Sequence, residues 1–209
     1  LRVPLVQVST DEVYGPAPPG IFFDETAPLR PGNGYSATKA AGDLLVLAAV
    51  NTYGLEACVT RCVNNFGPRQ HPEKFLPRML TRALQGRPLP VYTPGDQVRD
   101  WIPVRSHCEA ILAVLERGAP GEIYNVAAHA ECRNFDMALK VIEATGAPRS
   151  LIHLVEDRPG HDRRYGVTNE KLIGLGWQPP QQPEWDRAFA AMISWYEAER
   201  SWWLGKVTQ

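Results

Sequence analysis

The stretch V8-S-T-D-E-V-Y-G15 decides the fold, together with the residues just before it. Residues 5–8 (L-V-Q-V) form a short, largely apolar run that ends in polar and acidic residues and then in a loop rich in glycine and proline. Such a run, ended by turn residues, is typical of a buried parallel strand. The ligand crevice of an open α/β sheet lies outside the carboxyl ends of its strands, so Thr10, Asp11 and Glu12 are expected at a functional site.

A second motif, Y35-S-A-T-K39, follows the loop and opens a predicted helix over 35–53 that Gly54 ends. The i, i+4 spacing places Tyr35 and Lys39 on one face of this helix. An ammonium within a few Å would lower the pKa of the phenol from about 10 by roughly one to three units, which is one way to make a base.

The later part of this helix, residues 44–50 (L-L-V-L-A-A-V), is apolar almost all round, so more than one face should be buried. One face can cover the sheet and the other is available to a partner subunit. The alternative is a helix buried on both faces within one chain.

Composition narrows the class of protein. The chain has 209 residues, 44% hydrophobic and 22% charged, with a net charge of −1, as in an ordinary globular protein. It has no block of like charge, which argues against nucleic acid or a membrane surface as a partner. No apolar run approaches the roughly 18 residues that a membrane-spanning helix needs, and a cytoplasmic location is expected.

The cysteines indicate a reducing compartment. Cys58, Cys62, Cys108 and Cys132 form no C-x-x-C pair and have no histidine at ligand spacing, so neither a disulfide nor a metal site is expected. Cys58 and Cys62 share a strand and its parity and should pack as small hydrophobic side chains.

Further elements follow from runs of apolar residues and from glycine and proline. We predict strands at 5–10, 56–63, 99–104, 121–127 and 151–155, and helices at 74–85, 106–117, 134–145 and 184–203. The short, mixed elements after Gly67 indicate a smaller domain that follows the sheet.

Three more motifs support a family assignment: R61-C-V-N-N-F-G-P68, G95-D-Q-V-R-D-W101 and D157-R-P-G-H-D-R-R-Y165. Together with the motifs at 8–15 and 35–39, and in the same order along the chain, they resemble the extended short-chain dehydrogenase/reductase superfamily. Within it they resemble the nucleotide-sugar 4,6-dehydratases. The resemblance implies an α/β fold: a partial Rossmann-like, doubly wound parallel sheet plus a smaller α/β substrate-binding domain. It also implies NAD as cofactor, a nucleotide-diphosphate sugar as substrate, and a homodimer formed through the helix that begins at Tyr35.

The superfamily resembled here has a glycine-rich dinucleotide motif near its N-terminus, and no G-x-G-x-x-G or G-x-x-G-x-x-G occurs in this chain. At about 30 residues per βαβ unit, about 100 further residues are expected upstream. Residues 1–66, with 96–118 returning to them, are therefore expected to form the C-terminal part of an NAD-binding Rossmann domain. Residues 67–209 would mainly form the domain that binds the sugar nucleotide.

The resemblance also implies catalytic roles. Tyr35 is the base at the sugar 4-hydroxyl, Lys39 lowers its pKa and holds the nicotinamide ribose, and Thr10 hydrogen-bonds the 4-hydroxyl. Asp11 protonates the leaving 6-hydroxyl, and Glu12 removes the proton from C5. Consecutive strand residues point in opposite directions, so both acids can act only if the strand has ended and the backbone turns. Otherwise one of them is a helix cap or a loop carboxylate.

Further residues are assigned by the same resemblance. The cofactor set is Ser9, Tyr35, Lys39, Cys62 and Asn65. The substrate set is Thr10, Asn64, Glu73, Lys74, Arg99, Asn134, Arg158 and His161. Three alternatives stay open: one of the two asparagines serves only a turn, Arg99 pairs with Asp100, and Glu73 marks a helix N-terminus.

The implied reaction is NAD-dependent loss of water from a nucleotide-diphosphate glucose, with dTDP as the expected nucleotide. Oxidation at C4 precedes elimination across C5 and C6, and hydride returns to C6. The alternatives are the same chemistry on UDP-glucose, a sugar-nucleotide 4-epimerase, and a non-catalytic remnant of such an enzyme.

Overall fold

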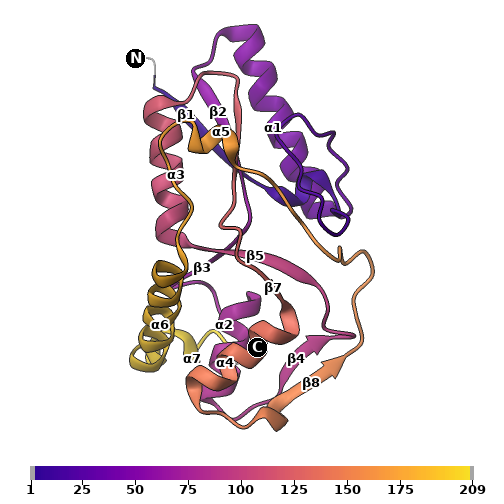
Figure 1. The fold of residues 1–209 in the computed structure, drawn as a ribbon, viewed down its shortest axis with the longest axis vertical. Helices are drawn as coiled ribbons and strands as arrows, with labels where there is room; N and C mark the ends of the chain where they lie inside the picture. Colours follow the sequence, from indigo (N-terminus) through magenta and orange to yellow (C-terminus); the bar gives the residue numbers. More distant parts are fainter. Residues whose placement is uncertain (1–2, 208–209) are drawn as a thin grey trace. The chain divides into compact units, whose positions relative to one another are not determined.

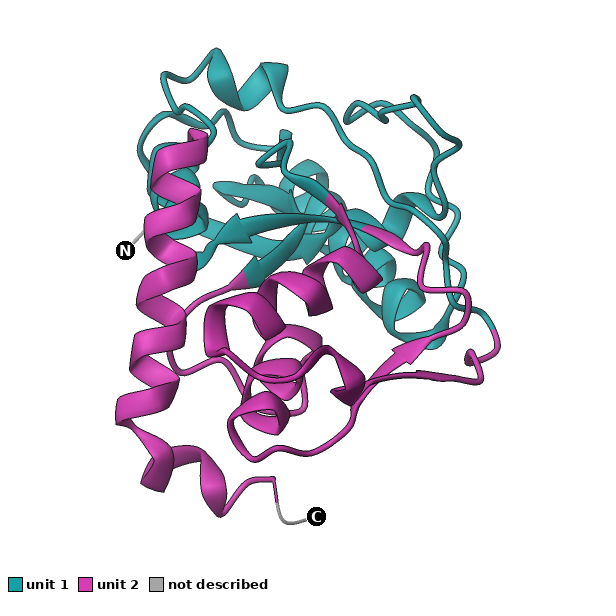
Figure 2. Ribbon diagram, turned by 60° about the horizontal axis from the view of Figure 1, so that its bottom comes forward, with its two compact units in different colours: residues 1–65, 99–131, 160–180 teal, residues 66–98, 132–159, 181–209 magenta. Residues whose placement is uncertain are grey.

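The computed structural model describes residues 3–207, and they form two compact units (Figure 2). Unit 1 comprises the chain up to Asn65, Arg99–Glu131 and Gly160–Pro180, and the remainder is unit 2. The sequence pattern indicated one returning segment, whereas unit 1 has two. Residues 160–180 belong to unit 1 because Val167, Leu172 and Trp177 are part of its hydrophobic core.

The helices and strands fall into three groups. Unit 1 contains β1 (Leu5–Thr10), η1 (Asp11–Tyr14), α1 (Gly34–Tyr53), β2 (Ala57–Cys62), α3 (Val104–Arg117), β6 (Ile123–Val126) and α5 (Glu170–Ile173). Unit 2 contains α2 (Phe75–Leu84), β4 (Leu89–Tyr92), α4 (Asn134–Thr145), η2 (Arg149–Leu151), β8 (Ile152–Val155), α6 (Gln182–Ala198) and α7 (Arg200–Leu204). The chain passes between the units within β3 (Asn64–Phe66), β5 (Val98–Pro103) and β7 (Glu131–Arg133), which form a sheet in the order β3-β5-β7.

The main sheet of unit 1 has the strand order β1-β2-β6, and both pairs of strands are parallel. Thr10 is in register with Cys62, and Cys62 with Val126, so the carboxyl ends of all three strands coincide. Helices α1 and α3 lie on either side of these strands (Figure 1). The predicted α/β fold with a doubly wound parallel sheet is confirmed.

Strand β1 is less buried than its apolar sequence indicated. It is an edge strand of the three-stranded sheet among the described residues, and the Val8 side chain is 41% exposed. Only its last two residues, Ser9 and Thr10, are buried. The buried part of the strand is therefore the part that leads into the predicted site.

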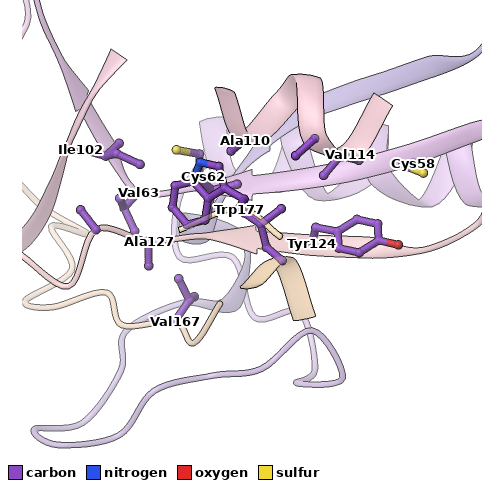
Figure 3. Close-up of a cluster of buried hydrophobic side chains, with 14 of the residues drawn as sticks. Cys58, Cys62, Val63, Ile102, Ala110, Val114, Tyr124, Ala127, Val167 and Trp177 are labelled. Atoms are coloured by element: carbon purple, nitrogen blue, oxygen red, sulfur yellow. The ribbon is translucent and has the colours of Figure 1, made fainter. Parts of the chain in front are cut away.

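The core of unit 1 is formed between the sheet and α3 (Figure 3). Cys58 and Cys62 of β2 are both buried and free, and they pack with Ala110 and Val114 of α3, as predicted for small hydrophobic side chains. Trp177 completes this core, and its indole N–H donates to the Ser106 carbonyl at 3.2 Å.

Unit 2 has a parallel pair of strands, β4 and β8, against which α2 and α4 pack. Strand β4 was not predicted, because Pro88 and Pro90 flank and interrupt its apolar residues. The single helix expected over 184–203 is two helices, since the backbone leaves helical geometry at Glu199 (φ −99°, ψ 42°).

Helix α1 buries one narrow face. Its buried residues are Ser36, Ala40 and Asp43, whereas Leu45 and Tyr53 are 72% and 83% exposed. The alternative of a helix buried on both faces within the chain is therefore wrong for the described residues. No helix among residues 3–207 is long and apolar enough to cross a membrane.

Candidate active site

The carboxyl end of β1 turns at once into a short 3₁₀ helix. Thr10 is its N-cap, and the Thr10 hydroxyl accepts the Glu12 backbone N–H at 3.3 Å. The turn closes at Gly15, whose φ is +76°, and a Cβ there would lie 2.4 Å from the Arg30 carbonyl oxygen. The backbone therefore turns at the acidic pair, as its proposed chemistry requires.

Asp11 is a buried carboxyl group, 3% exposed. The Thr10 hydroxyl donates to its Oδ1 at 3.3 Å. Burial, reinforced by the neighbouring Glu12 charge, raises the pKa of Asp11 to about 8. Asp11 therefore holds a proton at neutral pH and can give it to a leaving group.

Glu12 occupies a different environment, half-buried and surrounded by hydrogen-bond donors. The Asn33 amide nitrogen and the Tyr165 hydroxyl each lie 3.4 Å from its Oε2. The single Tyr165 proton has a closer acceptor in Asp162, at 2.7 Å, so Glu12 keeps capacity to accept another proton. Tyr165 was not predicted as a site residue, although it ends the D157–Y165 motif.

Tyr35 stands at the start of α1, which Asn33 and Ser36 cap reciprocally: Asn33 Oδ1 accepts the Ser36 N–H at 2.9 Å. The Tyr35 side chain is 56% exposed and hydrogen-bonds Thr10. Burial, Glu12 and Asp11 raise its pKa.

The raised pKa of Tyr35 differs from the expectation that Lys39 lowers it. The reason is geometric, because the Lys39 ammonium donates to the Val8 carbonyl at 2.6 Å instead of lying against the phenol. Lys39 is thereby held near the carboxyl end of β1.

A buried network fixes α1 on the sheet. The Arg61 guanidinium of β2 pairs with Asp43 at 2.9 Å, and both side chains are almost fully buried. Arg61 also donates to the Tyr14 hydroxyl at 2.8 Å, which in turn donates to Asn125 Oδ1 at 2.8 Å. Asp43 lies one helical turn beyond Lys39, so this network sets the rotation of the helix that carries Tyr35. These contacts join distant segments, and no local pattern predicts them.

Asn64 and Asn65, which follow the end of β2, lie in strand β3 rather than in a turn. Asn65 donates to the Val63 carbonyl at 3.2 Å and to Cys62 Sγ at 3.5 Å, and its Oδ1 lies 2.9 Å from His107 Nδ1. Burial raises the pKa of Cys62 and lowers that of His107 to about 4, so His107 is neutral at pH 7. His107 was missed, since a histidine inside an amphipathic helix carries no local signal.

Arg99 is buried, and its guanidinium donates to the Asp162 carbonyl at 2.8 Å and lies over the Tyr165 ring at 4.5 Å. Burial lowers its pKa. The adjacent Asp100 carboxylate accepts backbone N–H groups from residues 128, 129 and 130 at 2.8–3.0 Å. Eleven of the predicted site residues belong to unit 1: Ser9, Thr10, Asp11, Glu12, Tyr35, Lys39, Cys62, Asn64, Asn65, Arg99 and His161.

The other four predicted ligands belong to unit 2. Glu73, Lys74 and Arg158 are exposed. Asn134 is buried at the first position of α4, and its Oδ1 has no hydrogen-bond partner among the described residues. A buried amide oxygen without a partner is a ready acceptor for a ligand group.

No group of three or more His, Cys, Asp or Glu side chains within residues 3–207 could hold a metal ion.

Several known proteins are similar to this chain over most of its length. The chain is 44% identical to dTDP-glucose 4,6-dehydratase of an Actinoplanes strain over 95% of its own length and 61% of the relative's. The crystal structure of dTDP-glucose 4,6-dehydratase from Bacillus anthracis, in complex with NAD, matches 97% of this chain and 64% of that one, with a TM-score of 0.91 and 42% identity. UDP-glucose 4-epimerase from Thermus thermophilus, complexed with NAD, gives a TM-score of 0.86 and 30% identity over 94% of this chain and 65% of that one.

The chain spans about three-fifths of the length of the curated relatives it matches. The profile of the NAD dependent epimerase/dehydratase family matches residues 2–127, which include the strand end at Thr10, the Tyr35–Lys39 pair and the asparagine pair at 64–65. The chain therefore belongs to the NAD dependent epimerase/dehydratase family.

Proposed function

We propose that the full-length protein converts dTDP-glucose to dTDP-4-keto-6-deoxyglucose, with NAD as its cofactor. The curated dTDP-glucose 4,6-dehydratases that match the chain are 40–45% identical to it, whereas the matched 4-epimerase is 30% identical.

The main support for this function is the pair Asp11 and Glu12, two carboxyl groups that lie at one turn but in different environments. Asp11 is buried, with a pKa of about 8, so it can supply a proton, while half-buried Glu12 can accept one. Elimination of water needs such an acid and such a base at adjacent carbon atoms, but epimerisation at a single carbon does not.

Each residue then has one task. Tyr35, hydrogen-bonded to Thr10, takes the proton of the 4-hydroxyl, and Thr10 orients that hydroxyl. Glu12 takes the proton from C5, and Asp11 protonates the departing 6-hydroxyl. When hydride reaches C6, a solvent proton returns to C5 through Glu12. Bound NAD would supply the hydride acceptor for C4 and the hydride donor for C6.

The residues at the strand ends fit the nicotinamide end of this cofactor. Lys39 and Asn65 lie at the carboxyl ends of β1 and β2, and the buried Ser9 hydroxyl has no hydrogen-bond partner among the described residues. We assign Ser9, Tyr35, Lys39, Cys62 and Asn65 to the cofactor. The 209 residues contain no glycine-rich dinucleotide loop, so this assignment does not extend to the pyrophosphate.

We assign the sugar nucleotide to the residues that the resemblance implied. Arg99, His161, Lys74 and Arg158 have cationic or hydrogen-bonding groups that match a diphosphate. Asn64, Glu73 and Asn134 supply the remaining polar contacts. We propose residues 67–98 and 132–159 as the main substrate-binding segments.

The test is product analysis on the full-length protein with dTDP-glucose in deuterated water. We expect a 4-keto-6-deoxy product with solvent deuterium at C5 and the original C4 hydrogen at C6. A product with inverted configuration at C4 and its 6-hydroxyl intact would identify a 4-epimerase instead. UDP-glucose assayed in parallel measures the nucleotide preference.

We further propose a cytoplasmic homodimer that packs through α1. The exposed face of this helix carries Leu44, Leu45 and Tyr53, and the four cysteines are free. Light scattering on the full-length protein should give twice the chain mass, and Leu45→Lys should shift it toward the monomer. An unchanged mass in this variant would place the interface elsewhere.

A further inference from the structure

An open cavity of about 280 Å³ lies in unit 2, and its lining includes none of the residues of the β1 strand end. It is lined by one face of α2, the turn that follows this helix, and the segment after α7. The charged groups of its lining are mainly cations: Arg78, Arg82, Arg87 and Lys206.

These arginines have no carboxylate partner among residues 3–207. Arg82 donates to the Pro88 carbonyl at 2.9 Å, and Arg87 to the Gln85 side-chain oxygen at 3.2 Å. Glu73, the one acid among the described lining residues, lies 3.9 Å from His71 instead. The positive charge of the cavity is therefore not neutralised from within.

The arrangement costs stability in the absence of a ligand. Arg78 and Arg82 are one turn apart on α2, and like charges at this spacing destabilise a helix. Burial, followed by the charges of Arg78 and Arg87, lowers the pKa of Arg82. The net charge of the whole chain is −1, so this concentration of cations is local.

The remaining polar groups complete an anion-binding set. Lys206 is held by its bond to the Trp202 carbonyl at 2.6 Å and lies 4.2 Å from the centroid of that indole ring. Gln85 adds an amide, and Thr81 a hydroxyl. Guanidinium forks match phosphate oxygens in pairs, and the volume suits an anion about the size of a diphosphate.

We propose that this cavity binds a small phosphate-bearing anion at a site separate from the predicted sugar-nucleotide residues. Of those residues only Glu73 contributes to its lining, whereas Lys74, Asn134 and Arg158 do not. The site would sense inorganic phosphate, diphosphate or a small phosphate ester.

The test is calorimetric titration of the full-length protein with inorganic diphosphate at low ionic strength, with and without saturating dTDP. We expect saturable binding in both conditions, weakened about tenfold or more in Arg78→Gln/Arg82→Gln, because two charge-assisted hydrogen-bond donors are removed. The matched control is Arg187→Gln, an exposed arginine of the same unit outside the cavity, which should bind within about twofold of the parent.

Three results would overturn the proposal: no saturable binding, full competition by dTDP, or equal affinity in the double variant. If the double variant does not fold, Arg78→Gln alone decides the question, because this side chain is exposed and is not among the buried residues of α2. A loss of about threefold or more in affinity would then be expected. An unchanged affinity would exclude the site. Turnover of dTDP-glucose is measured separately, so failure of this site leaves the proposed reaction untouched.

Discussion

The predicted catalytic residues of unit 1 and the predicted substrate ligands of unit 2 are held in different ways. In unit 1, Thr10 and Asp11 are buried at a capped turn, and the helix carrying Tyr35 is fixed by the buried Arg61–Asp43 pair. In unit 2, three of the four predicted ligands are exposed. Groups that move protons must be placed accurately before substrate arrives, whereas charged ligands of a diphosphate can close on it. Mutations in the two regions should therefore separate effects on rate and folding from effects on binding.

The largest expected effect is on rate, from Tyr35→Phe in the full-length protein. Removing the phenol oxygen removes the group that takes the 4-hydroxyl proton, and general base catalysis contributes about 10²–10⁴-fold. Substrate-dependent reduction of bound NAD, followed by nicotinamide absorbance in a single turnover, should slow by this factor. The control is Tyr53→Phe at the other end of the same helix, which keeps the aromatic ring in the proposed dimer face and should leave this rate unchanged. A normal rate in Tyr35→Phe would exclude this tyrosine as the base.

The next effect is on folding, from Arg61→Met. This change leaves the Asp43 carboxylate buried and without its cation, which should cost about 3–5 kcal/mol in the free energy of unfolding. Urea unfolding measures this loss. The double variant Arg61→Met/Asp43→Leu should recover much of it, because no buried charge is left unpaired. A loss below about 1 kcal/mol in the single variant would mean that the pair does not hold α1 in place.

Asp11→Asn tests whether Asp11 is protonated in the folded protein, through the pH dependence of the free energy of unfolding. The pKa of Asp11 is about 8 in the folded protein and 3.8 in its ordinary state, so the folded state holds the proton that the unfolded state releases. The free energy of unfolding should therefore fall as pH rises between about 4 and 8, by up to about 1.4 kcal/mol per pH unit from this group. Denaturant titrations at several pH values should show this slope in the parent and its loss in Asp11→Asn.

The matched control for that slope is Asp186→Asn, which removes an exposed carboxylate on α6. It should leave the pH dependence unchanged. If Asp11→Asn keeps the parent slope, Asp11 is ionised at neutral pH and is not the proton donor in the elimination.

How much of this could be predicted from the sequence differs between the two regions. The bounds of α1 and α4 and the turn after β1 follow from apolar runs punctuated by glycine, asparagine and proline, which act locally. Strand β4 escaped prediction because Pro88 and Pro90 argue against a strand, yet pairing with β8 overrides them. In the same way a pattern cannot show that His107 contacts Asn65, because 42 residues separate the two.

The smallest effect on folding is expected for two variants of unit 2, Lys74→Ala and Arg158→Ala. Both side chains are exposed, so the free energy of unfolding should change by no more than about 0.5 kcal/mol. Each removes a cation from the proposed diphosphate site, so dTDP should bind about tenfold more weakly and the KM for dTDP-glucose should rise, while kcat changes little. Arg187→Ala is the control that removes an exposed arginine of the same unit. If instead kcat fell and dTDP affinity stayed constant, these exposed residues would take part in the reaction itself, and the division between a rigid catalytic region and an adaptable binding region would be wrong.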